Sequence, residues 1–203
     1  MAIFRWPLAL IIALILLFVT YTGIRALIEA YDSSGFPEAL AIKVELLPVI
    51  FPVHMVTGGL TLLLVPATIF ARRTRWHKTL GRITALMIII SGLTAPIVAW
   101  QIPVTLISAA GFTAQALAWM GLLTAGIWNI RNGRIKAHQT YMLMVAAVTS
   151  GAIFFRIYLG LYAHYGPRGF FYYFYGFNAW IAWLLPLIVV YVLTRPNLVR
   201  QLH

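Results

Sequence analysis

The ionic side chains of this 203-residue chain are sorted by segment, and this sorting constrains the fold more than any other feature. All four acidic residues fall within residues 29–45, and most of the basic ones fall within residues 72–82 and 131–136. The stretches between these segments are apolar. Such sorting is typical of a chain that crosses a bilayer repeatedly, because charges are costly inside the membrane and collect in the connections.

Composition supports the same class of protein. The chain is 62% hydrophobic and 9% charged, whereas a soluble domain carries about 25% charged residues. The net charge of +11 comes from basic residues beside apolar stretches, a placement that favours anionic lipid headgroups over nucleic acid. Cysteine is absent, so disulfides and thiolate metal ligands are excluded.

A membrane-spanning helix needs about 20 mostly apolar residues, and six stretches meet this requirement. They are residues 6–24, 46–71, 80–102, 105–130, 138–161 and 174–194. The first resembles a signal peptide, but its length and its poor cleavage site favour an uncleaved anchor. We therefore predict an all-α fold, in which residues 1–203 form a single membrane domain of six transmembrane helices.

The distribution of Lys and Arg orients these spans. The second-to-third and fourth-to-fifth connections and the C-terminal tail carry ten of them: Arg72, Arg73, Arg75, Lys78, Arg82, Arg131, Arg134, Lys136, Arg195 and Arg200. On the opposite side Arg25 and Lys43 are outweighed by the four acids, and only Arg168 follows. Cytoplasmic loops retain Lys and Arg, so both termini are predicted to be cytoplasmic.

Two ionisable residues lie inside predicted spans at matching depths. His54 lies about 17 residues from the inner end of its span and Arg156 about 18 residues from the inner end of its own, roughly 25 Å at helical rise. A buried Arg costs about 2.5–3.5 kcal/mol at the membrane centre, and no span contains an acid. Arg156 is expected to snorkel outward, to pair with a loop carboxylate such as Glu45, or to bind an anionic ligand group.

His77 and His138 form a second possible pair. Each opens a helix that starts on the cytoplasmic side, so the two imidazoles can meet around one metal or one haem iron. The alternative is a pair of interfacial histidines bonded to headgroups. His164 lies some 14 Å above His54 at helical rise, too far to share an iron whose two axial nitrogens are about 4 Å apart.

Glycines accompany two of the histidines. Gly58 follows His54 by four residues and Gly81 follows His77 by four, and residues at this spacing share a helix face. Gly59 widens the first gap. A macrocycle or a neighbouring helix can fill such a gap, and small residues are also common where membrane helices pack.

Four short motifs carry a family resemblance. They are HMVTG at residues 54–58, HKTLGR at 77–82, RIKAHQTYM at 134–142 and RIY at 156–158. Together they resemble the domain of unknown function 2306 family of bacterial multi-pass membrane proteins, over about residues 52–161. The chain departs from that pattern at Tyr141, where Trp is expected, and at Met144, where a basic residue is common.

The resemblance implies that His54, His77, His138 and Arg156 are the family's polar positions and that the protein lies in the cell inner membrane. The family is also distantly similar to membrane b-type cytochromes. The expected function is haem b- or quinone-linked electron transfer. His77 and His138 would be the axial ligands of the iron, and His54 with Arg156 would contact a propionate or a quinone oxygen. Membrane redox proteins would be partners. The alternative is a non-enzymatic accessory or assembly subunit of a membrane complex.

Overall fold

The computed structural model describes residues 14, 17–18, 21, 24 and 38–199. Its elements are α2 Glu38–Leu46, α3 Ile50–Phe70, η2 Ala71–Arg73, α4 His77–Trp100, α5 Leu106–Arg131, α6 Ile135–Tyr165, η3 Arg168–Phe170 and α7 Phe171–Val199. Five helices in this part are long and apolar enough to cross a membrane, namely α3 to α7. The predicted all-helical membrane fold is confirmed for these five. The predicted first span, residues 6–24, lies outside the described residues except at five isolated positions.

Helices α4, α6 and α7 each begin three residues before the apolar stretch that predicted them. For example, α4 begins at His77 rather than residue 80, and α6 runs from Ile135 to Tyr165 rather than over residues 138–161. The apolar pattern marks only the part of each helix that lies in hydrocarbon, whereas polar first and last turns continue the same helix into the interface. At α3 the difference is reversed, because Pro48, expected within the span, lies in the turn before Ile50.

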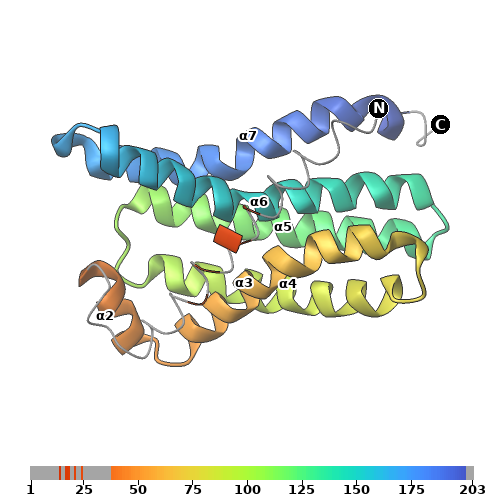
Figure 1. Cartoon of the computed structure of the whole chain (residues 1–203), viewed down its shortest axis with the longest axis horizontal. Coiled ribbons are helices and arrows are strands. Elements are labelled where there is room, and N and C mark those ends of the chain that lie inside the picture. Colours follow the sequence, from red (N-terminus) through yellow and green to blue (C-terminus); the bar gives the residue numbers. More distant parts are fainter. Residues whose placement is uncertain (1–13, 15–16, 19–20, 22–23, 25–37, 200–203) are drawn as a thin grey trace.

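The five long helices run alternately up and down, side by side (Figure 1). Helix α3 packs against α4 and α6, and α5 packs against α4, α6 and α7. Helices α3 to α6 therefore form a ring of four in which α4 and α6 lie opposite each other, and α7 packs on the outside of α5 and α6.

The basic connections lie at one end of this bundle (Figure 1). The η2 segment and residues 74–76 join α3 to α4 there, and residues 132–134 join α5 to α6 at the same end. Helix α2, the α4–α5 connection and η3 lie at the opposite end. Alternation of charge along the sequence thus becomes separation of charge between the two ends of the bundle.

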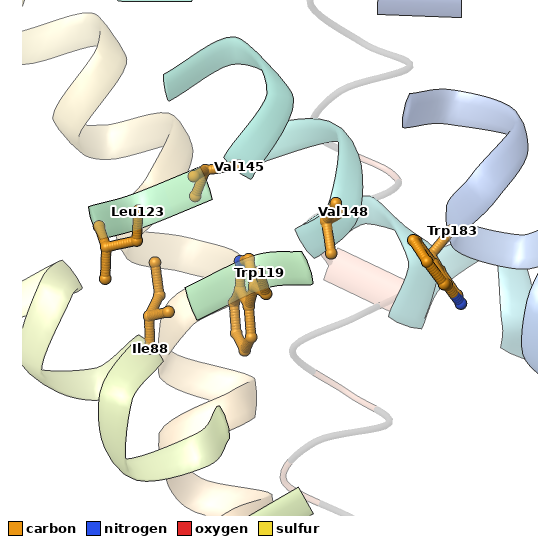
Figure 2. Packing of buried hydrophobic residues seen from close by; sticks show 6 residues of the cluster. All are labelled: Ile88, Trp119, Leu123, Val145, Val148 and Trp183. Carbon is orange, nitrogen blue, oxygen red and sulfur yellow. The ribbon is translucent and has the colours of Figure 1, made fainter. Parts of the chain in front are cut away.

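The apolar core joins α4, α5, α6 and α7. Its buried side chains are Ile88, Trp119, Leu123, Val145, Val148 and Trp183 (Figure 2). The indole Nε1 of Trp119 donates a buried hydrogen bond of 2.9 Å to Oγ1 of Thr149, so the one polar atom of this large side chain is satisfied. The core therefore fixes how α5 and α6 lie against each other near the middle of the bundle.

A buried cation attaches the short helix α2 to the bundle. Lys43 is buried, and its Nζ donates a 2.9 Å hydrogen bond to the carbonyl oxygen of Val98. Val98 lies in the last turn of α4, where carbonyls have no partner within the helix and positive charge is favourable. Burial lowers the pKa of the Lys43 ammonium group. This contact holds α2 over the end of α4 that lies opposite the basic connections.

Candidate functional site

His54 of α3 is held against α4 by its Nδ1 atom. Nδ1 lies 3.1 Å from the carbonyl oxygen of Ser91 and 3.2 Å from Oγ1 of Thr94. A carbonyl can only accept, and the Thr94 hydroxyl already donates to the carbonyl oxygen of Ile90. Nδ1 therefore carries the proton, and in the neutral imidazole Nε2 keeps its lone pair.

His77 and His138 repeat this arrangement. Nδ1 of His77 lies 3.1 Å from the carbonyl oxygen of Thr68 on α3, and Nδ1 of His138 lies 2.9 Å from the carbonyl oxygen of Gly126 on α5. Both rings must donate from Nδ1, so in the neutral imidazole Nε2 of each keeps its lone pair. In the part of the chain that the structure describes, no hydrogen bond occupies Nε2 of any of the three.

The two inner histidines start at the same end of the bundle. His77 is the first residue of α4 and His138 lies in the first turns of α6, two helices that begin at the basic end (Figure 1). Each imidazole bonds to its own hairpin partner, and within the described residues no hydrogen bond or ring contact joins the two. No three His, Cys, Asp or Glu residues of the described part gather to hold a bare metal ion.

Arg156 lies on α6, which packs against α3, the helix of His54. It is half-buried, and its Nη1 donates a 2.8 Å hydrogen bond to the carbonyl oxygen of Ala152. Its charge interacts with the His54 ring and with the phenol of Tyr175. No described carboxylate pairs with Arg156, and Glu45 is exposed. The cluster His54–Arg156–Tyr175 therefore joins α3, α6 and α7.

Tyr175 was missed by sequence reasoning because it belongs to an aromatic run, residues 170–177, that looks like an interfacial belt. Its ring is fixed by three aromatic contacts, with centroid distances of 5.3 Å to Phe155, 5.7 Å to Phe171 and 6.3 Å to Phe112. Its hydroxyl has no hydrogen-bond partner among the described residues. No sequence signal separates Tyr175 from the other tyrosines in the run.

Asn178 lies about one turn further along α7 and is fully buried, at 0% exposure. Its Nδ2 donates a 3.0 Å hydrogen bond to the carbonyl oxygen of Phe155, the residue before Arg156. Its Oδ1 is the only buried side-chain nitrogen or oxygen in the described part without a partner. The Tyr175 hydroxyl and His54 Nε2 also lack hydrogen-bond partners among the described residues, but neither atom is fully buried.

The described part includes two shallow, open depressions of the surface. One, of about 400 Å³, lies between α6 and α7 and is lined by Tyr158, Leu161, Tyr162, Tyr165, Gly166 and Phe174. The other, of about 320 Å³, lies at the start of α6 and is lined by Gly133, Arg134, Ile135 and Lys136. Neither is lined by His54, His77 or His138.

The glycines beside the histidines differ in their surroundings. A Cβ on Gly58 would lie 3.2 Å from Oγ of Ser91, so this glycine lets α3 approach α4 closely. A Cβ on Gly81 would meet Thr68 at 3.9 Å, an ordinary contact, and one on Gly59 would meet nothing within 4 Å. Helix packing accounts for Gly58, while Gly59 and Gly81 leave space beside their helices.

The remaining histidines lie apart from these groups. His164 is exposed in the last turn of α6, with its ring 4.6 Å from that of Tyr165. His203 lies outside the described residues.

Comparison with known proteins places the chain in one family. A family model described as "Predicted membrane protein (DUF2306)" matches residues 51–194, which is well over half of the chain and runs from the first turn of α3 to Thr194 of α7. No curated protein and no solved structure matches the chain, so the distant similarity to b-type cytochromes stays a prediction. By this match and by its five apolar spanning helices, the chain belongs to the DUF2306 family of predicted membrane proteins.

Proposed function

We propose that the protein is a membrane electron-transfer protein that holds one haem b through His77 and His138. The observation that carries this proposal is their shared hydrogen bonding, in which Nδ1 donates to a backbone carbonyl and Nε2 stays free. Histidines that bind metals characteristically donate their other ring nitrogen in this way, which fixes the tautomer and raises ligand basicity. Haem iron would supply reversible one-electron chemistry.

The arrangement of the helices supports the same pair. Packed helices lie 8–10 Å apart, so opposite members of a ring of four are separated by roughly 11–14 Å. An iron bound by two imidazoles needs their Nε2 atoms about 4 Å apart. Two helices that pack directly against each other leave little room between them for both rings and the iron. Helices α4 and α6 are opposite members of the ring and start at the same end. The donor set therefore fits a haem whose protein ligands come from α4 and α6.

His54 and Arg156 serve a different part of this function. They lie roughly 25 Å from the inner ends of their spans, too far to contact a haem held at the basic end. Of the two ligand groups expected for them, a propionate and a quinone oxygen, the second is compatible with that distance. We therefore assign them to quinone, as an electron donor or acceptor that moves within the bilayer.

One observation favours the alternative of a non-enzymatic accessory or assembly subunit. Each of the three histidines bonds to a carbonyl of the adjacent helix, His54 and His77 within the α3–α4 hairpin and His138 within α5–α6. Such bonds stabilise hairpins without any ligand. On this alternative the imidazoles are structural and Nε2 has no role.

We propose that the protein has six spans in the inner membrane and that both termini are cytoplasmic. The basic residues at one end of the bundle support this orientation. The absence of native cysteine allows a direct test with single cysteines at exposed positions. In spheroplasts, a membrane-impermeant maleimide is expected to label Gly169→Cys at once and Arg75→Cys only after lysis. The reverse pattern would refute the proposed orientation.

An absorption spectrum tests the electron-transfer proposal. Full-length protein is purified in mild detergent from haem-replete cells, and spectra are recorded before and after dithionite. We expect a reduced-minus-oxidised band in the visible region, because a bis-imidazole haem changes its absorption on reduction. A preparation with no such band would favour the accessory-subunit alternative.

A further inference from the structure

We infer that Tyr175 and Asn178 of α7 complete, with His54 and Arg156, a binding site for the head group of a membrane quinone. The site rests on the proposed electron-transfer function, for which the quinone is the mobile partner. It extends the pair expected from sequence by two residues and commits that pair to one class of ligand. The four residues come from three different helices, α3, α6 and α7.

The positive charge of Arg156 favours a ligand with an electron-rich oxygen. Arg156 uses one N–H for the carbonyl of Ala152, and its other donors have no partner in the described part of the chain. Its two polar neighbours, the imidazole of His54 and the phenol of Tyr175, supply no negative charge to pair with the guanidinium. An unpaired guanidinium within a membrane span is costly, and a ligand oxygen that accepts from it would offset that cost.

The mixture of donors and acceptors selects among ligands with such oxygens. Arg156 and the Tyr175 hydroxyl can donate, whereas His54 Nε2 can accept, and Asn178 holds α7 against the turn of α6 that carries Arg156. A quinone oxygen accepts in the oxidised form and donates as a hydroxyl in the reduced form, so the couple can use both kinds of group. A carboxylate or a phosphate diester only accepts, and it would leave the His54 acceptor unmatched.

The surroundings suit a flat ring on an apolar tail. Phe112, Phe155 and Phe171 surround the Tyr175 ring, two of them edge-on, and aromatic side chains pack well against another planar ring in offset or edge-on arrangements. The apolar depression of about 400 Å³ between α6 and α7 starts close by in sequence. It includes Tyr158, two residues after Arg156, and Phe174, which precedes Tyr175.

The test uses full-length protein in phosphatidylcholine nanodiscs with a benzoquinone that carries a ten-carbon tail. Quinones quench tryptophan fluorescence, and Trp180 and Trp183 lie on the same helix as Tyr175. We expect saturable quenching by the parent and at least a tenfold rise in Kd for Tyr175→Phe and Arg156→Gln. The matched control is Tyr191→Phe, an exposed tyrosine of α7 away from the site, which is expected to bind like the parent.

Decanoic acid separates a quinone site from a general anion site, since it carries a similar tail on a carboxylate. Weak competition by decanoate supports the inference. Competition as strong as that of the quinone, parental affinity in Tyr175→Phe, or quenching that never saturates would overturn it. A colourless protein that binds quinone with these residue dependences would refute the haem proposal and still support the site.

Discussion

Replacing Gly151 by alanine is expected to disrupt the junction of α5, α6 and α7. A Cβ at this position would lie 2.6 Å from Cβ and 3.1 Å from Cα of Trp183, and 2.9 Å from Nε2 of Gln115. The Trp183 atoms belong to or adjoin the backbone, so α7 itself must move. Trp183 is part of the buried core (Figure 2), and overpacking of such a core costs about 1–3 kcal/mol, occasionally more.

The measurement is the unfolding midpoint of purified protein titrated with a denaturing detergent, read by circular dichroism. Gly160→Ala is the matched control on the same helix, because Gly160 is exposed and a Cβ there meets nothing within 4 Å. It should equal or exceed the parent in stability, since alanine favours a helix interior by about 0.5–1 kcal/mol over glycine. Equal midpoints for the two variants would contradict the close approach of α6 and α7.

Replacing His77 or His138 by asparagine is expected to abolish haem binding while leaving the fold intact. The asparagine amide nitrogen lies close to the position of histidine Nδ1, so it can still donate to the carbonyl of Thr68 or Gly126. It has no equivalent of Nε2, however, and cannot serve as an axial ligand. The reduced-minus-oxidised band should fall to near zero in either variant, with circular dichroism and elution volume unchanged.

His54→Asn is the control for this pair. It retains the same kind of donor toward the Ser91 carbonyl, but His54 is assigned to the quinone and not to the iron. The band should therefore persist in this variant. Parental bands in His77→Asn and His138→Asn would refute their role as ligands, and a band lost only in His54→Asn would reassign the haem to the outer half.

The sequence predicted the bundle well because hydrophobicity and charge report directly on the bilayer. Apolar runs locate α3 to α7, and the count of Lys and Arg anticipates that residues 72–82 and 131–136 share one end. Equal distance from the inner ends also suggests that His54 and Arg156 share a site, which stays a prediction. Each of these inferences depends on distance along a helix of known rise, which sequence alone supplies.

Other features depend on contacts that residue identity does not encode. The partners of all three imidazoles are backbone carbonyls, which any residue provides. Tyr175 stands out from its aromatic neighbours only through its place beside Arg156. Lys43 falls within a predicted connection, yet it is buried against the end of α4. Gly151 and Gly160 are both glycines within the predicted fifth span, and only packing distinguishes them.

The central claim, that His77 and His138 hold haem b in this bundle, is tested most directly by haem content per chain. Full-length protein from haem-replete cells is assayed as the pyridine haemochrome and compared with its protein concentration. The proposal predicts close to one haem b per chain in the parent, and almost none in His77→Asn and His138→Asn. Parent protein that is folded and free of haem would contradict it.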